Sequence, residues 1–154
     1  RRIVRYLKAW IDYRNNQNIK IKMHSGFIMT ILATENVFYD ERDDIAMKNT
    51  LESIYSNLCE AKGGKFECKR PTTPKGEDLF ANFSDTRKDY FLTQLESFSN
   101  SAKQAVVGEN PKESCLKWQK HFGERFSCSS ASEKDENAKS YSSPAIIAIN
   151  AKNA

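Results

Sequence analysis

The sequence lacks a long apolar run, a secretory signal peptide and any pair of cysteines spaced as Cys-x-x-Cys. A helix needs roughly 18–20 apolar residues to cross a bilayer, so the lack of such a run predicts a protein without a membrane partner. The four cysteines are scattered along the chain. We therefore expect a cytoplasmic protein with free thiols.

A zinc site is the alternative use of the cysteines. Cys115, His121 and Cys128 supply suitable ligand atoms. Their spacing fits no standard zinc pattern, so we favour free thiols over a metal site.

Positive charge is concentrated at the start of the chain. The formal net charge is +4, whereas residues 1–24 carry seven basic side chains and one acidic one, a balance of +6, which leaves −2 for the remainder. A basic segment is what a polyphosphate or nucleic-acid ligand needs, although a solvated face has the same composition. We see no strong case for nucleic acid, because the excess of positive charge is confined to this segment.

Apolar residues recur at helical spacing through most of the chain, and capping or helix-breaking residues separate the runs. This pattern predicts a mainly α protein, a bundle of about five helices. The second run, about residues 25–35, is apolar almost all round, which predicts a buried, central helix. The first run forms one stripe, made of Ile3, Val4, Leu7, Trp10 and Ile11.

The other helices are predicted from residues that start or stop helices. Between the third and fourth helices, alternation over residues 65–70 predicts a short strand, and the prolines of residues 70–78 exclude regular structure. The predicted boundaries are Asp43 and Asp44 as caps and Gly63-Gly64 as the end of the third helix, Ser84 and Gly108 for the fourth, and Gly123 as the end of the fifth.

Two polar residues lie where neighbouring helices could jointly bind a triphosphate. Lys8 falls about a quarter-turn from the centre of the first apolar stripe, so its stem can pack while its ammonium group reaches a ligand. Ser25 opens the second helix, whose N-terminal amides and dipole favour anions. The alternatives are a solvated Lys8 that faces Asp12 and an ordinary N-cap at Ser25.

The composition changes near the C-terminal end. Residues 127–143 contain seven serines and charges of both signs, which predicts a flexible linker. Residues 144–154 form a short, rather apolar tail. Such a tail can pack back on the helices or add a strand to another sheet.

Five segments follow one another along the chain: Arg1–Trp10, Ser25–Leu32, the helix start Arg42-Asp43-Asp44, Arg70–Leu79 and Trp118–Phe126. In this order they resemble the C-terminal helical half of bacterial cGAS/DncV-like nucleotidyltransferases, which make cyclic oligonucleotide second messengers in CBASS anti-phage defence. The resemblance covers about residues 1–127. It implies that residues 1–126 form the helical C-terminal lobe of an α/β nucleotidyltransferase.

The resemblance implies that Lys8 and Ser25 bind the outer phosphates of the donor nucleotide, with ATP or GTP as substrates. It also places Arg42, Asp44 and the 70–78 loop near the bases, with a helix cap as the alternative for Asp44. One position departs from the family. In the animal cyclic GMP-AMP synthase a base-stacking tyrosine follows the matching serine, whereas Gly26 follows it here.

The catalytic signature of the family is missing. These enzymes hold two Mg²⁺ ions with three carboxylates, introduced by a Gly-Ser turn, and this chain has no Gly-Ser turn followed by a spaced acidic pair. The chain also starts inside a helical pattern at Arg1. We therefore expect the C-terminal part of a longer enzyme, inactive alone, whose preceding lobe holds the Mg²⁺.

The resemblance implies a second role for the tail. The C-terminus of many such enzymes is activated and conjugated, as in ubiquitin, by a fused ubiquitin-activating and -transferring partner. A slender tail on a flexible tether suits this chemistry, with Ala154 as the reactive end. The alternatives are a terminus without special function and, for the whole chain, a stand-alone helical module that binds nucleic acid or protein.

Overall fold

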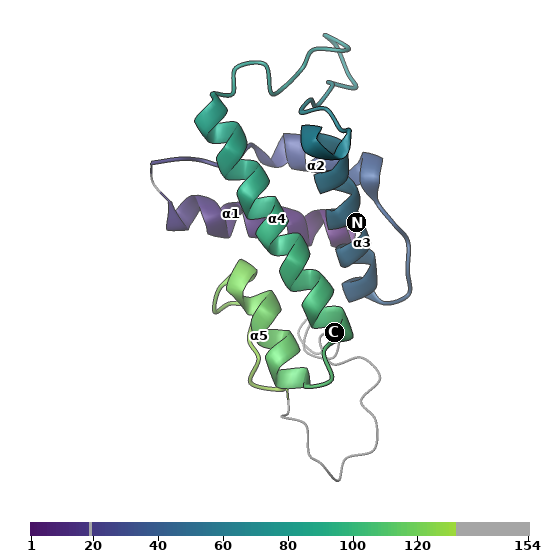
Figure 1. Ribbon diagram of the computed structural model, residues 1–154, viewed down its shortest axis with the longest axis vertical. Coiled ribbons are helices and arrows are strands. Elements are labelled where there is room, and N and C mark those ends of the chain that lie inside the picture. The colour runs from purple at the N-terminus through teal and green to yellow at the C-terminus, as the bar shows by residue number, and fades with distance from the viewer. Residues whose placement is uncertain (19, 132–154) are drawn as a thin grey trace.

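The computed structural model describes residues 1–18 and 20–131, and this part of the chain is mainly α-helical, as the sequence predicts. No strand forms among these residues. The predictions for residues 132–143, for the tail and for Ala154 lie outside them. The elements, shown in Figure 1, are α1 (Arg2–Gln17), α2 (Gly26–Asn36), α3 (Asp43–Leu58), the 3-10 turn η1 (Glu60–Lys62), α4 (Asp85–Val107) and α5 (Pro111–Phe122).

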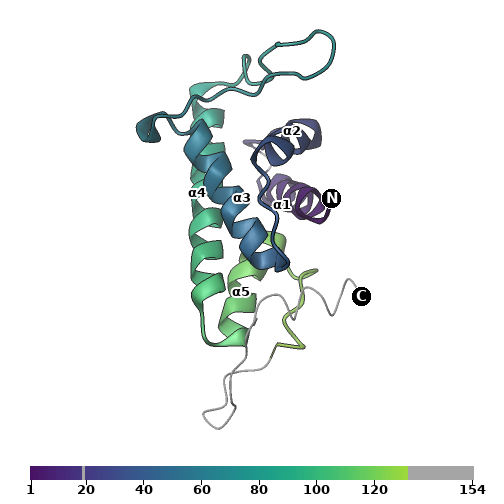
Figure 2. The same ribbon diagram turned by 90° about the vertical axis from the view of Figure 1, so that its right-hand side faces the viewer.

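The helices form two layers that cross at a large angle. α3, α4 and α5 lie along one another, and α1 and α2 lie side by side across them (Figures 1 and 2). The prediction that the second helix is central is wrong. α2 lies at the edge of the fold, against α1 and α3, and its residue Phe27 is 46% exposed.

Trp10 fixes α1 to the second layer. Its indole is fully buried, 5.0 Å from the ring centre of Phe98 and 6.4 Å from that of Phe91, both in α4. Aromatic rings at such spacings contribute dispersion and quadrupole attraction beyond the area they bury. The stripe predicted from the sequence therefore faces the core, with Leu7 and Ile11 on either side of Trp10.

Three predicted helix ends are confirmed by their hydrogen bonds and dihedral angles. The hydroxyl of Ser25 accepts from the Ile28 amide at 3.4 Å, and Ser84 caps α4 in the same way. Gly123 ends α5 with φ of 78°. A side chain there would be strained and would also meet the ring of Tyr13 at 2.5 Å.

The predicted ends of the third helix are wrong. Arg42 is the N-cap residue, and Asp43 and Asp44 occupy the first turn. Their carboxylates are used in tertiary contacts and in the field of the helix N-terminus rather than as a side-chain cap. The helix ends at Leu58, before η1 and Gly63, because the backbone at Cys59 leaves the helical region.

The predicted short strand over residues 65–70 is also wrong. The segment makes one isolated bridge, between Lys69 and Asp78. The carboxylate of Asp78 accepts from the amides of Cys68 and Phe80, at 3.0 Å each. These bonds satisfy the backbone locally, so no ladder is needed.

Two buried histidines join elements that are distant in the sequence. The Nε2 of His121 lies 2.9 Å from the Ser101 hydroxyl, and its Nδ1 lies 3.0 Å from the Arg14 guanidinium. Burial lowers the pKa of His121 to about 3, and the charge of Arg14 adds to this effect. Burial likewise lowers the pKa of His24, packed edge-on against Phe91, to about 4.

These histidines predict a loss of stability in acid. Their pKa in the unfolded chain is about 6.5, so below that pH the unfolded state binds more protons than the folded state. The free energy of unfolding should then fall by up to about 1.4 kcal/mol per pH unit for each histidine, down to about pH 4. Urea unfolding at several pH values between about 7 and 4 measures this slope.

His24→Phe is the matched control, because phenylalanine keeps the ring contact with Phe91 but does not titrate. The variant should lose stability less steeply with acid than the parent protein. Equal slopes would show that His24 is not buried in its neutral form.

Candidate nucleotide-binding site

Lys8 crosses the start of α2. Its exposed side chain leaves α1 on the side next to α2, and a methyl group built on Gly26 would lie 3.7 Å from Cε of Lys8. This distance is an ordinary van der Waals contact, so the lysine stem lies against the residue that follows Ser25. No ion pair joins Lys8 to Asp12 within the described residues. The exposed Lys8 side chain agrees both with the solvated alternative and with a ligand contact.

Ser25 supplies the second half of this arrangement. It is the N-cap of α2, as predicted, and its hydroxyl accepts from the Ile28 amide. The backbone N–H groups of Gly26 and Phe27 belong to the first turn of α2, so no carbonyl of the helix accepts a hydrogen bond from them. The helix N-terminus and the Lys8 ammonium group therefore place two sources of positive potential together.

An exposed aromatic residue follows Gly26 in the first turn of α2. Phe27 is 46% exposed although it belongs to the most apolar helix. The guanidinium of Arg70 lies 5.6 Å from its ring centre, and Glu77 holds that guanidinium through a 2.8 Å bond. The sequence reasoning missed Phe27, although an aromatic residue one position after Gly26 was the available signal.

Arg42 and Asp44 bind each other. Two hydrogen bonds join the guanidinium to the carboxylate, at 2.6 and 3.1 Å, and Asp44 is fully buried. The bond to Asp44 raises the pKa of Arg42. Asp44 lines a groove whose lining does not include Lys8 or Ser25. The structure thus brings Lys8 next to Gly26, the residue after Ser25, but gives Arg42 and Asp44 a separate, mutual contact.

The neighbouring Asp43 ties α3 to α1. Its carboxylate accepts from the Tyr6 hydroxyl at 3.1 Å and pairs with Arg2 at 3.1 Å. Burial raises the pKa of Tyr6 to about 12, and the charge of Asp43 adds to the shift. Two basic residues of the first segment therefore form polar contacts between helices: Arg2 pairs with Asp43 and Arg14 hydrogen-bonds to His121. Lys8 forms no such polar contact among the described residues.

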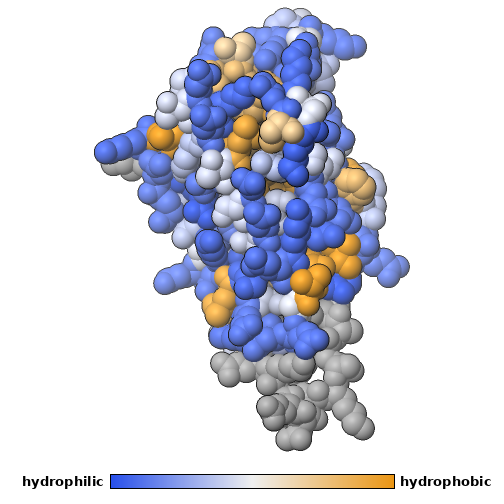
Figure 3. All heavy atoms as spheres, in the orientation of Figure 1, coloured by the Kyte–Doolittle hydropathy of each residue, from blue (hydrophilic) through white to orange (hydrophobic). Residues whose placement is uncertain are grey.

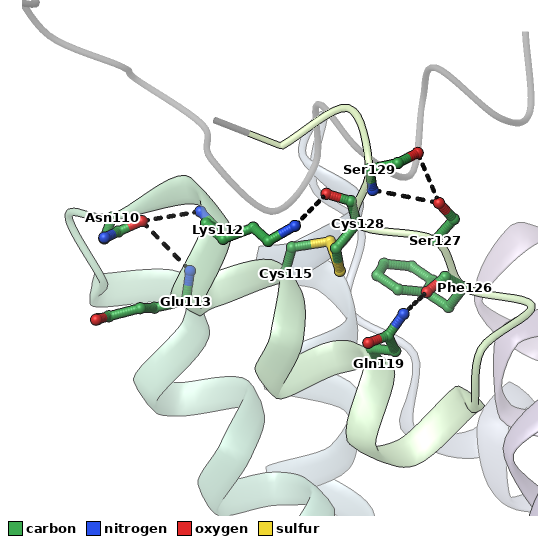
Figure 4. Close-up of a disulfide and its surroundings, with 9 residues drawn as sticks. All are labelled: Asn110, Lys112, Glu113, Cys115, Gln119, Phe126, Ser127, Cys128 and Ser129. Atoms are coloured by element: carbon green, nitrogen blue, oxygen red, sulfur yellow. Dashed lines mark hydrogen bonds between the residues drawn. A yellow bond between two sulfur atoms is a disulfide. The ribbon is translucent and has the colours of Figure 1, made fainter. Parts of the chain in front are cut away.

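Two of the four cysteines are bonded to each other, which corrects the prediction of free thiols. Cys115 in α5 and Cys128 form a disulfide with a Cα–Cα distance of 5.7 Å, because the chain turns back along α5 after Gly123 (Figure 4). The Gln119 amide holds this return by donating to the Phe126 carbonyl at 2.7 Å. The disulfide removes the zinc alternative and one of the grounds for a cytoplasmic location.

No three His, Cys, Asp or Glu side chains in the described part of the chain are placed to hold a metal ion. None of its helices is both long and apolar enough to cross a membrane. The face drawn in Figure 3 is mostly hydrophilic, with small and separate apolar patches.

A scan of the chain against protein-family models found no match.

The disulfide should stabilise the C-terminal part of the described fold. It closes a loop with a sequence separation of 13 residues, for which loop-closure entropy gives about 3 kcal/mol. The double variant Cys115→Ala/Cys128→Ala should lose about that much in urea unfolding. Adding a thiol reductant should bring the parent protein to the stability of the variant. Unchanged stability of the reduced parent protein would contradict this role.

Proposed function

We propose that this chain is the helical, nucleotide-binding part of a cyclic oligonucleotide synthase of bacterial anti-phage defence. In this proposal Lys8 and Ser25 bind the outer phosphates of the donor, ATP or GTP. The observation that carries it is the stem of Lys8 lying against the first residue of α2. The resemblance of five ordered segments supplies the enzyme class.

The electrostatics of this arrangement favour an anionic ligand. A protonated lysine beside a helix N-terminus is a repulsive pairing, because both carry positive potential. Lys8 has no counter-ion among the described residues, so an anion between the two would relieve the repulsion. A triphosphate provides several oxygens for the ammonium group and the α2 amides together.

Phe27 is our candidate for the base-stacking residue that Gly26 cannot provide. Its exposed ring stands in the first turn of α2, and Arg70 adds a planar cation. Aromatic rings and guanidinium planes both stack on nucleobases, at about 1–3 kcal/mol per base for aromatic residues. In this arrangement the phosphates bind at Lys8 while the base stacks at Phe27.

The described residues bind and orient the nucleotide but do not perform the transfer. They contain no carboxylate cluster that fits Mg²⁺, so we assign the two ions, which activate the attacking hydroxyl and neutralise the leaving pyrophosphate, to a preceding lobe. We propose that the enzyme acts in the cytoplasm, where nucleoside triphosphates are available.

Replacing Lys8 tests the proposed site. In the longer protein that carries this chain, Lys8→Ala should lower product formation from labelled ATP and GTP at least about tenfold, which corresponds to about 1.4 kcal/mol. The loss should appear mainly as weaker triphosphate binding, since the lysine contacts phosphates. Phe27→Ala should weaken the binding of the nucleoside triphosphate, because the base loses its stacking partner. The binding of inorganic triphosphate, which has no base, should not change.

Lys20→Ala is the matched control. Lys20 is exposed and belongs to the same basic segment, and its side chain makes no contact among the described residues. It should therefore keep parental activity. Equal losses in the two variants would indicate a diffuse charge effect, and salt-sensitive binding to duplex without nucleotide would favour the nucleic-acid module instead. An unchanged Lys8→Ala variant would reject the assigned role.

The second part of the proposal concerns the C-terminus. We propose that a partner with ubiquitin-activating and -transferring activities adenylates the Ala154 carboxylate with ATP and releases pyrophosphate. A cysteine thiolate of the partner then attacks the acyl adenylate, displaces AMP and forms a thioester. Mass spectrometry after incubation with such a partner and ATP should identify a product linked through Ala154. Normal conjugation of an Ala154→Glu variant would contradict the need for a small terminal residue.

A further inference from the structure

A groove whose lining does not include Lys8 opens along α1. It has a volume of about 730 Å³ and lies between α1, the first turns of α3, α5 and the segment after Gly123. Its apolar lining is mostly aromatic: Tyr6, Tyr13, Met47, Trp118, Phe122 and Phe126. An apolar groove of this size on a soluble domain is a binding surface for apolar side chains.

Trp118 forms part of the floor of this groove. The residue is 1% exposed, and its Nε1 is buried without an acceptor among the described residues. The groove therefore offers an occupant the apolar edge of the indole ring rather than its N–H. An apolar side chain is the group that such a surface binds best.

The charge of the rim selects against acidic occupants. Asp43 and Asp44 are already paired with arginines. Asp12 and Glu124 are exposed and have no ion pair among the described residues, and Arg125 is the one basic residue in the lining. A segment that is apolar and free of acidic residues therefore fits the groove best.

The sequence of this chain contains such a segment close by. Residues 137–154 have no acidic side chain, and Ile146, Ile147 and Ile149 lie together within them. The chain reaches this segment from the wall of the groove itself, because Phe126 lines the groove and Cys128 is bonded to α5. The 14 residues from position 131 to 145 can span up to about 48 Å.

We propose that residues 144–154 bind in this groove of the same molecule, with the isoleucines on the aromatic floor. The inference does not rest on the proposed nucleotide site. A tether of this length gives the segment an effective concentration in the millimolar range, so even weak contacts suffice for occupancy. The occupant is thus the protein's own C-terminal segment rather than a second copy.

Photo-crosslinking tests the proposal. With p-benzoylphenylalanine in place of Ile147 in the full chain, irradiation should link this position to peptides containing Met47 or residues 118–126, within one molecule. The yield should not change on roughly tenfold dilution, because the tether fixes the local concentration. Linked dimers whose yield falls on dilution would overturn the proposal in favour of a second copy, and so would the absence of groove crosslinks.

Two variants separate groove binding from random contact. Ala9→Glu places an acidic side chain on the exposed α1 face of the groove and should lower the yield at least about fivefold, as should Ile146→Asp/Ile149→Asp. Ala81 is exposed and does not line the groove, so Ala81→Glu should leave the crosslinking yield unchanged. Equal yields from Ala9→Glu and Ala81→Glu, with both folded by circular dichroism, would overturn the assignment to this groove.

Discussion

The burial of Trp10 between α1 and the long helix α4 determines where the two proposed binding surfaces lie. Because the indole packs against Phe91 and Phe98, α1 cannot rotate about its axis without opening a cavity in the core. The same rotation would break the contact of Arg14 with His121. One face of α1 is thereby fixed against the core, and Lys8 is held on the side next to α2.

Two buried carboxylates are paired with arginines within the fold, whereas Lys8 forms no ion pair among the described residues. The buried carboxylates of Asp43 and Asp44 are compensated by Arg2 and Arg42, so they hold α1 and the start of α3 in place. Lys8 differs from these arginines because it faces a helix N-terminus and no carboxylate. A positive charge that the fold leaves uncompensated at such a point is suited to a phosphate ligand.

The segment after α5 shapes the second surface. Gly123 turns the chain back, the disulfide holds the return against α5, and Phe126 then forms part of the groove wall. The groove lining does not include Lys8 or Ser25, so the two surfaces use different residues of α1.

Apolar periodicity and the caps Ser25 and Ser84 are local signals, so the sequence predicts most of the helices, and it also places Lys8 at the border of the core stripe. The sequence could not predict that Asp43 would pair with Arg2, that Cys115 would meet Cys128, or that α2 would lie at an edge with Phe27 exposed. These three features follow from tertiary packing, because each depends on how segments distant in the sequence lie against one another, and periodicity within one helix carries no information about that arrangement.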